Sequence, residues 1–505
     1  MKNMRNLAKL LFSRVVLISL AIILQLVFLS LGFTRLREFR RWIYIAMTAL
    51  SWLTVLYIIS KRSNPSYKIA WIILILVFPV FGMTFYLFLG RNKLSGRDNR
   101  KMQKIFSRNA PLLSAPQPQI SDLTAKYHSD YLRRVSSFGA YFDSSAEYFS
   151  CGEDCFEKML DDLKAAKRSI YLEFFILAPG KLWDGILDVL TEKARQGVDV
   201  RVIFDDFGCI RRLPAFYSRR LRRLGIQAYA FSPYLPIASA RLNNRDHRKL
   251  MIIDGTIGYT GGVNLADEYA NFTSPLGYWK DCALRIEGNA VWSMSVMFLA
   301  MWQFVSKTET SLQKPSFVPK FQDAGLVQPF CDTPLDEEDV SATEYLNLIH
   351  HAHRSLYIMT PYLVLDESMS NALCSAAKAG VDVRIVTPSV PDKWYVHAVT
   401  RANYNALLCS GVRIFEYLPG FLHAKVCLVD GAYAMVGTVN LDYRSLYLHY
   451  EDAVFLHAGK AVSQIEADFS RLFPQCREIT PDDQKQVSFW RRLLRNLLRL
   501  FSPLM

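Results

Sequence analysis

The sequence predicts an α/β protein in which two tandem domains, each a mostly parallel sheet flanked by helices, form one shared active site and follow N-terminal transmembrane helices. Three features of the 505 residues predict this architecture. The first hundred residues contain three long apolar runs, the remainder repeats itself once, and each copy alternates strand-like and helix-like patterns.

Residues 1–104 are expected to form a membrane anchor. Their charge-free runs, at about 15–33, 42–60 and 69–90, suffice for two to three transmembrane helices, because a bilayer core needs about 20 apolar residues. A cleaved signal peptide is the alternative for the first run. That run is too long, lacks a small-residue cleavage site and is followed by two more, so an uncleaved anchor is favoured.

The charge distribution favours a membrane partner. Residues 1–104 hold 17 Lys and Arg residues against two acidic ones, whereas the rest of the chain has a net charge of −1. The excess therefore lies where anionic headgroups would be, and the neutral globular part argues against nucleic-acid binding. Ten basic residues flank the side of the anchor shared with the later domains and seven flank the other, which predicts a multi-pass protein of the cell membrane with cytoplasmic catalytic domains. The odd count of nine Cys also fits a reducing compartment.

Residues 135–487 contain a tandem duplication. The sequence GVDVRVI at 197–203 returns as GVDVRIV at 380–386. In the first copy, 169–176 is predicted to be a buried strand, 182–196 a helix and 198–204 a strand, and this order is typical of βαβ units. We expect a linker at 105–134, a first domain at 135–325 and a second domain at 326–487.

One pattern of reactive residues occurs in each copy. Its members are His247, Lys249, Asp254 and Asn264 in the first copy and His423, Lys425, Asp430 and Asn440 in the second. His and Lys two residues apart on a strand point to the same face, and Asn can return there on the neighbouring strand. Lys and Asn can hold a phosphate and stabilise its developing charge, and His can act as a nucleophile or as a general acid and base. Two facing halves would thus provide one His to attack phosphorus and one to protonate the leaving oxygen.

Asp254 and Asp430 each precede Gly, which is typical of an ordinary turn. They are candidate catalytic residues as members of the pattern, but a structural role in positioning it is favoured. The two copies also differ at one place, because Gly262 of the first corresponds to Thr438 of the second.

These residues resemble the paired HKD motifs of the phospholipase D superfamily, and the chain is more narrowly similar to the bacterial cardiolipin synthases. The resemblance extends over nearly the whole chain. It includes KRSNP at 61–65, NNRD at 243–246, PGFLHAK at 419–425, LDYRS at 441–445 and SPL at 502–504.

The resemblance implies a phosphatidyltransferase that works through a phospho-histidine, without a metal or other cofactor. It implies His247 as the nucleophile, and Asp281 and Glu451 as carboxylates that orient the His of their own copies, 34 and 28 residues after it. The expected substrate is phosphatidylglycerol as both donor and acceptor, giving cardiolipin and glycerol. The alternatives are a phospholipase D-type hydrolase, or a transferase with another donor or acceptor. The apolar runs argue against a nuclease and the two intact motifs against a non-enzymatic scaffold, while the oligomeric state stays open.

Two further clusters and the C-terminus complete the candidates. His350, His351 and His353, and likewise Cys151 and Cys155, lack a second ligand pair at zinc spacing, so both clusters are expected to be structural or at the surface. Residues 488–505 are predicted to form a basic amphipathic helix. It could pack on the second domain, but a position on the membrane surface is favoured. Its apolar face comprises Trp490, Leu493, Leu494, Leu497, Leu498 and Phe501.

Overall fold

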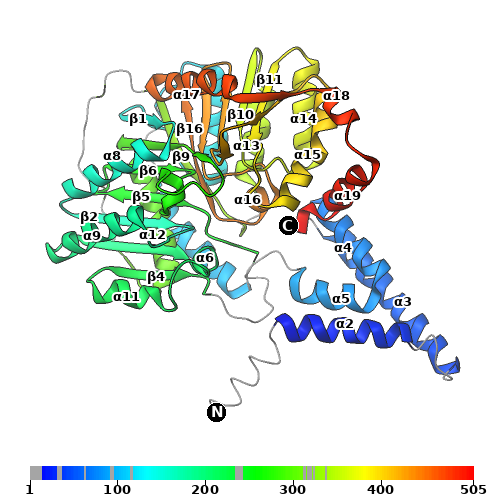
Figure 1. Ribbon diagram of the computed structural model, residues 1–505. Helices are drawn as coiled ribbons and strands as arrows, with labels where there is room; N and C mark the ends of the chain where they lie inside the picture. The colour runs from blue at the N-terminus through cyan, green and yellow to red at the C-terminus, as the bar shows by residue number, and fades with distance from the viewer. Residues whose placement is uncertain are drawn as a thin grey trace.

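The computed structural model describes residues 14–30, 37–61, 64–90, 96–113, 118–233, 243–310, 314, 321, 325–335 and 338–504 (Figure 1). The basic residues Lys2, Arg5 and Lys9, and parts of the basic loops used to predict topology, lie outside these ranges. Two sheets form the body of the protein, and the N-terminal helices project from it on one side.

The first half is a seven-stranded mixed sheet with the strand order β1-β8-β6-β5-β2-β3-β4. The strands are β1 (Ser144–Phe149), β2 (Ser169–Phe174), β3 (Asp199–Asp205), β4 (Gln227–Phe231), β5 (Lys249–Ile253), β6 (Ile257–Gly261) and β8 (Ala283–Gly288). The predicted strand, helix and strand are confirmed as β2, α9 (Lys181–Arg195) and β3. The Leu182, Ile186, Leu187 and Leu190 side chains of α9 are buried, as its 3.6-residue periodicity requires.

The second half is an eight-stranded mixed sheet with the order β17-β12-β11-β10-β14-β15-β16-β9. Its strands are β9 (Leu326–Asp332), β10 (Ser355–Met359), β11 (Asp382–Pro388), β12 (Arg413–Tyr417), β14 (Val426–Val429), β15 (Tyr433–Gly437), β16 (Glu451–His457) and β17 (Cys476–Ile479). The order β6-β5-β2-β3-β4 of the first sheet corresponds to β15-β14-β10-β11-β12 here, which is how the duplication appears in the structure.

The prediction of mostly parallel sheets is wrong. Only β2, β3 and β4, and likewise β10, β11 and β12, are parallel neighbours; the other pairings in both sheets are antiparallel. The cause lies in the turns that follow the two motif strands. Asp254 and Gly255 have φ values of 54° and 69°, and Asp430 and Gly431 have 53° and 68°. Such a tight turn returns the chain at once, and only antiparallel strands can be joined that way.

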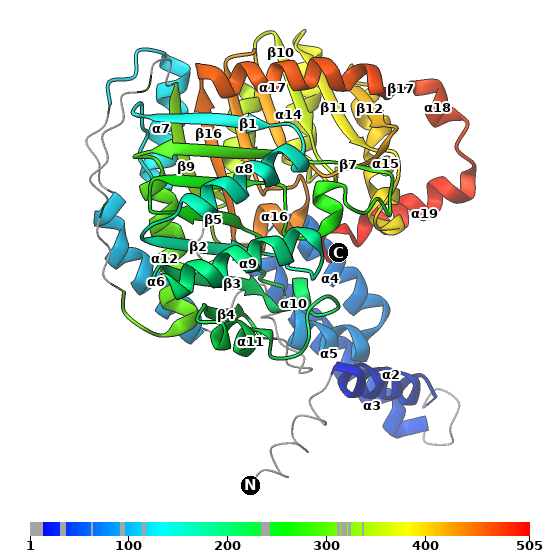
Figure 2. The ribbon, with the colours of Figure 1, turned by 60° about the vertical axis from the view of Figure 1, so that its left-hand side comes forward.

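Helices pack against both sheets (Figure 2). They include α8 (Gly152–Ala165), α11 (Tyr217–Arg223), α12 (Val291–Ser306), α13 (Val340–His350), α14 (Glu367–Lys378), α15 (Trp394–Leu408), α16 (Tyr443–Tyr447) and α17 (Gly459–Leu472), besides α9. Helix α12 is buried on all sides from Val291 to Gln303, as expected for a helix without a polar face.

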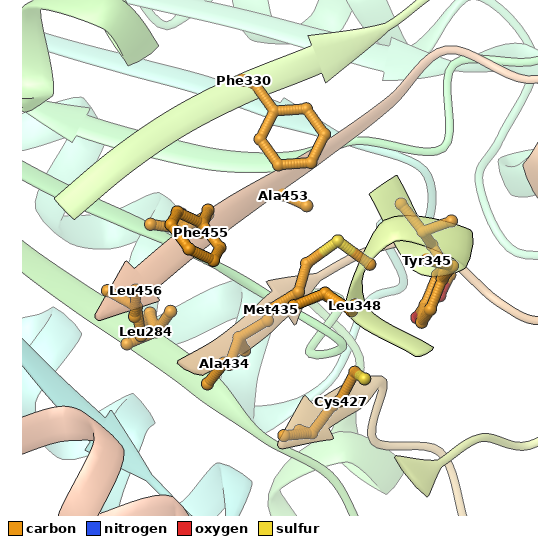
Figure 3. Packing of buried hydrophobic residues seen from close by; sticks show 14 of the residues in the cluster. Leu284, Phe330, Tyr345, Leu348, Cys427, Ala434, Met435, Ala453, Phe455 and Leu456 are labelled. Atoms are coloured by element: carbon orange, nitrogen blue, oxygen red, sulfur yellow. The ribbon is translucent and has the colours of Figure 1, made fainter. Parts of the chain in front are cut away.

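The two halves share one hydrophobic core. Figure 3 shows Leu284 of β8, from the first half, beside Leu456 of β16, from the second. A small parallel sheet also joins the halves, because β7 (Tyr278–Lys280) of the first pairs with β13 (Gly420–Leu422) of the second. The halves therefore form one packed body, held together by backbone hydrogen bonds as well as by apolar burial.

The N-terminal helices are α2 (Arg14–Ser30), α3 (Arg37–Ser60), α4 (Pro65–Val77) and α5 (Pro79–Leu89). Among the described residues, the segment Arg41–Ser60 is the one helical stretch long and apolar enough to cross a membrane. The expected third span is not a single helix. It breaks at Phe78, before Pro79, whose ring cannot continue a helix. Gln25 Oε1 of α2 accepts the backbone N–H groups of Val80 and Phe81, which satisfies the donors that begin α5.

The region between the anchor and the sheets is largely helical. It contains α6 (Gly96–Asn109) and α7 (Leu123–Ser136), and α7 docks on the second half through His128, whose Nδ1 lies 2.7 Å from Glu344 Oε1 of α13. At the C-terminus, α19 (Phe489–Leu500) packs on α15 and also contacts α4 (Figure 1). The last turn, η6 (Ser502–Leu504), contacts α4 and α16. The C-terminus thus joins the anchor to the second half.

Candidate active site

Both motif histidines lie where the two halves meet. His247 precedes β5 and is 6% exposed, and His423 precedes β14 and is 7% exposed. The His247 N–H donates to the carbonyl of Tyr450, and the His423 N–H donates to that of Lys280, over 2.9 and 2.7 Å. The backbone of each histidine is thereby bonded to the opposite half. The accepting residues, Tyr450 and Lys280, directly precede the buried carboxylates Glu451 and Asp281.

Those carboxylates contact the histidines across the interface. His247 Nδ1 lies 2.9 Å from both carboxylate oxygens of Glu451, and His423 Nδ1 lies 2.8 Å from Asp281 Oδ2. The expectation that each acid serves the His of its own copy is therefore wrong. The pairing is crossed because Glu451 and Asp281 directly follow the residues that hold the opposite histidine, whereas sequence spacing reports only neighbours along one copy.

The two lysines lie on the same side as the histidines. Lys249 Nζ donates to the His247 carbonyl over 2.7 Å, and Lys425 Nζ donates to the His423 carbonyl. Burial, and then the like charge of Lys425, lowers the pKa of Lys249 to about 7. Burial also lowers the pKa of Lys425 to about 8. Among the described residues neither ammonium group forms an ion pair, so the two are suited to hold an anion such as a phosphate.

Burial favours the neutral form of both imidazoles. Burial lowers the pKa of His247 to about 3 in spite of Glu451. Burial, followed by the charge of Lys425, lowers the pKa of His423 to about 4. Burial alone would raise the pKa of Glu451, but the charge and hydrogen bond of His247 outweigh it and the pKa falls. The carboxylate stays ionised and accepts a hydrogen bond from Nδ1–H of His247, so that Nε2 of His247 keeps a free lone pair.

The two motif asparagines are buried beside the motif strands. Asn264 Oδ1 accepts the backbone N–H of Ile176 over 3.0 Å, which turns its amide nitrogen to other partners. Asn440 Oδ1 has no hydrogen-bond partner among the described residues. Since phosphate oxygens accept hydrogen bonds, only the amide NH2 groups of these side chains, and not Oδ1, could bind a phosphate.

Asp254 and Asp430 are not part of this cluster. They follow β5 and β14 at the ends away from the histidines, and Asp254 lies about 16 Å along the strand from Lys249 at 3.3 Å per residue. The Asp254 carboxylate accepts the backbone N–H groups of Lys167, Arg168 and Ser169. The Asp430 carboxylate does the same for His353, Arg354 and Ser355. Their contacts are those of turn residues that fix the start of β2 and β10.

The difference between Gly262 and Thr438 has a structural cause. A Cβ atom on Gly262 would lie 1.8 Å from Asp281 Oδ1, so only Gly allows this carboxylate to approach. At the corresponding place in the other half, the Thr438 hydroxyl donates to Glu451. The shorter Asp281 side chain thus lies against Gly262, and the longer Glu451 side chain accepts a hydrogen bond from Thr438.

The sequence interpretation missed two residues of the site. Trp279 Nε1 donates to Asp281 Oδ2 over 3.2 Å, with its ring centroid 5.4 Å from that of His423. His449 occupies the equivalent position in the other half, with its ring 5.6 Å from that of His247. Both residues stand two positions before the carboxylate, and this shared offset is the signal that could have identified them.

The similarity of this chain to known protein families agrees with this geometry. A family model described as "Cardiolipin synthase, PLD-like domain" matches residues 159–274 and 345–473, and a phospholipase D-nuclease N-terminal model matches 49–91. The chain is 33% identical to a cardiolipin synthase of Listeria welshimeri, over 88% of this chain and 95% of that one. It is 30% identical to one of Halalkalibacterium halodurans, over 96% and 99%. An uncharacterized protein of Streptococcus mutans is 37% identical, over 90% and 99%.

Among solved structures, phosphatidylserine synthase of Haemophilus influenzae is similar, with a TM-score of 0.56. The match covers 76% of this chain and 98% of that protein at 13% sequence identity. At this identity the likeness shows a shared fold.

Proposed function

The chain belongs to the cardiolipin synthases of the phospholipase D superfamily, and from this premise we propose how its residues transfer a phosphatidyl group. The enzyme is a phosphatidyltransferase that acts on phospholipids. The observation that supports the proposed chemistry best is the crossed pair of His–carboxylate contacts, with one lysine beside each histidine.

In the first half-reaction, His247 Nε2 attacks the phosphorus of one phosphatidylglycerol. His423 takes part as the general acid in its protonated form, which it reaches by taking up a proton from solvent before this step. The bond from phosphorus to the headgroup glycerol oxygen breaks, and His423 donates that proton to the oxygen, so glycerol leaves. His247 becomes a phospho-imidazolium whose Nδ1–H proton is held by Glu451. Lys249, Lys425 and the two motif asparagines bind the phosphate oxygens.

In the second half-reaction, a headgroup hydroxyl of another phosphatidylglycerol attacks the same phosphorus. His423, now neutral, takes the hydroxyl proton, and the bond from phosphorus to nitrogen breaks. The products are cardiolipin and the original enzyme. The transfer itself needs no metal, because two lysines supply the positive charge.

The protein is a membrane protein, and we propose that it is multi-pass with its catalytic halves in the cytoplasm. The exposed apolar face of α19 would hold the site at the headgroup layer. Trp490 is 75% exposed although α19 contacts both α15 and α4, whereas Leu498 packs among Val364, Val399 and Tyr443. The helix thus uses one edge for packing and leaves its aromatic end for lipid.

Product analysis tests the proposal. The purified full chain is incubated in phosphatidylglycerol bilayers, and cardiolipin, phosphatidic acid and glycerol are quantified. We expect cardiolipin and glycerol in equal amounts with little phosphatidic acid, because an oriented acceptor hydroxyl gains about 7–11 kcal/mol over an unpositioned one. Phosphatidic acid as the main product would establish the hydrolase alternative instead.

A further inference from the structure

His449 has no role in the transfer just described, yet it lies against the nucleophile. Its side chain is 10% exposed, and neither ring nitrogen has a hydrogen-bond partner among the described residues. A buried imidazole that makes no well-formed hydrogen bond is costly, because each buried polar group should be hydrogen-bonded. Its Nδ1 lies 3.6 Å from Glu451 Oε1.

Glu451 lies between two imidazoles. One of its oxygens, Oε1, is 2.9 Å from His247 Nδ1 and 3.6 Å from His449 Nδ1. In a tetrahedral zinc site with bonds of about 2.0–2.1 Å, neighbouring ligand atoms are about 3.3–3.4 Å apart. The two observed separations lie on either side of this value. The three side chains are the one group of this kind in the described part of the chain, with ligand atoms all within 4.8 Å of one another.

The other half provides an internal comparison. At the position equivalent to His449 it has Trp279, which donates to Asp281 and cannot bind a metal. The His423 side therefore has one imidazole and one carboxylate where the His247 side has two imidazoles and one carboxylate. The additional donor is specific to the half that holds the proposed nucleophile.

We propose that His247, His449 and Glu451 form an inhibitory site for a divalent transition-metal ion with the ligand preference of zinc. The proposal builds on the proposed function, since inhibition presupposes that His247 is the nucleophile. On binding, the ion coordinates Nδ1 of His247 in place of the proton there, and through exchange with solvent the neutral ring carries its proton on Nε2 instead. Nε2 then has no lone pair with which to attack phosphorus, so phosphoryl transfer stops.

The neighbouring charges limit the affinity without removing it. Lys249 and Lys425 disfavour a cation, whereas Glu451 itself and the buried Asp452 favour one. Two imidazoles and a carboxylate are the ligand set of catalytic zinc sites, which keep a fourth position open. We therefore expect reversible binding that competes with the phosphate of the substrate.

The test uses the full chain in detergent without lipid, with Co²⁺ as a coloured substitute for Zn²⁺. We expect visible absorption that saturates at one ion per chain. In His449→Asn the affinity for Co²⁺ should fall by about tenfold or more. His353→Asn is the matched control, because it removes an exposed imidazole of the other histidine cluster. Unchanged binding in His449→Asn, or its loss in His353→Asn, would overturn the site.

A second measurement separates this proposal from the proposed function. Each protein is assayed in phosphatidylglycerol bilayers with increasing Zn²⁺, and activity is expressed relative to its own rate with chelator. Half-maximal inhibition should need about tenfold more Zn²⁺ in His449→Asn than in the unaltered chain. Co²⁺ binding that depends on His449, without any cardiolipin formed, would refute the function and keep the site. Cardiolipin formation with zinc inhibition indifferent to His449 would keep the function and refute the site.

Discussion

Glu451→Gln should impair the chemistry of a histidine in the other half of the chain. The Glu451 carboxylate lies 2.9 Å from His247 Nδ1 and is fully buried. When phosphorus bonds to Nε2 while Nδ1 keeps its proton, the ring becomes a cation. Two unit charges 2.9 Å apart interact by about 6 kcal/mol at an effective dielectric constant of about 20. Gln keeps the shape and loses this charge.

A loss of about 6 kcal/mol corresponds to roughly 10⁴ in rate. Loss of the carboxylate that orients a catalytic histidine has a similar cost in serine proteases, about 10⁴. We therefore expect Glu451→Gln to slow phospho-His247 formation about 10⁴-fold. Asp281→Asn is the matched variant, because it removes the carboxylate from His423 and leaves His247 untouched.

The assay uses two phosphodiesters that differ in their leaving group. With phosphatidylglycerol, both variants should be slow in forming alkali-stable phosphohistidine, because glycerol must be protonated as it leaves. With a p-nitrophenyl phosphodiester, whose leaving group needs no acid, Asp281→Asn should recover and Glu451→Gln should not. Thermal melting of each variant checks that it is folded. Recovery of Glu451→Gln in place of Asp281→Asn would exchange the roles of the two histidines.

Four further outcomes follow from the structure. Because the pKa of Lys249 is lowered to about 7, its ammonium is lost as pH rises, so kcat/KM should fall above about pH 7; Lys249→Arg should shift that fall upward in a pH–rate profile. Asp254→Ala should lower the melting temperature, with a loss of about 2–4 kcal/mol for three freed backbone donors, and leave kcat of the folded fraction within about threefold; a loss comparable to that of His247→Ala would return Asp254 to the catalytic set. A chelator should leave transfer intact in product analysis. A reporter after Lys104 should face the cytoplasm, which labelling at residue 100 by an impermeant reagent in intact cells would contradict.

Much of the catalytic region was predictable because it depends on local patterns. The strand at 169–176, the helix at 182–196 and the strand at 198–204 appear as β2, α9 and β3, since burial and periodicity within one segment determine them. The motif repeats also identified both histidines and lysines that the structure places in the interface. None of these inferences required knowledge of how the two halves dock.

One failed prediction depends on a contact between distant segments, and two others depend on local breaks and turns. The partner of His247 is chosen by the hydrogen bond from its N–H to Tyr450, 203 positions along the chain, and no spacing rule within one copy reports that contact. The break at Phe78 depends on Pro79, and Gln25 of another helix accepts the N–H groups that the break exposes. The antiparallel pairing of β5 with β6 was overlooked because the strand–helix–strand units nearby are parallel.

The surroundings of the two histidines also differ in a way that supports the division of labour. Beside His423, Lys425 Nζ lies 3.0 Å from Nδ1, and its charge is the strongest influence on the pKa of that ring after burial. An imidazolium there is unstable, which favours delivery of its proton to a leaving oxygen. Beside His247 the strongest influence after burial is Glu451, which favours a cationic ring. The Thr438 hydroxyl also donates to this carboxylate and stabilises its charge. A nucleophile must remain cationic while it holds phosphorus, whereas an acid must lose its proton, so the asymmetry supports the proposal that His247 attacks and His423 transfers the proton.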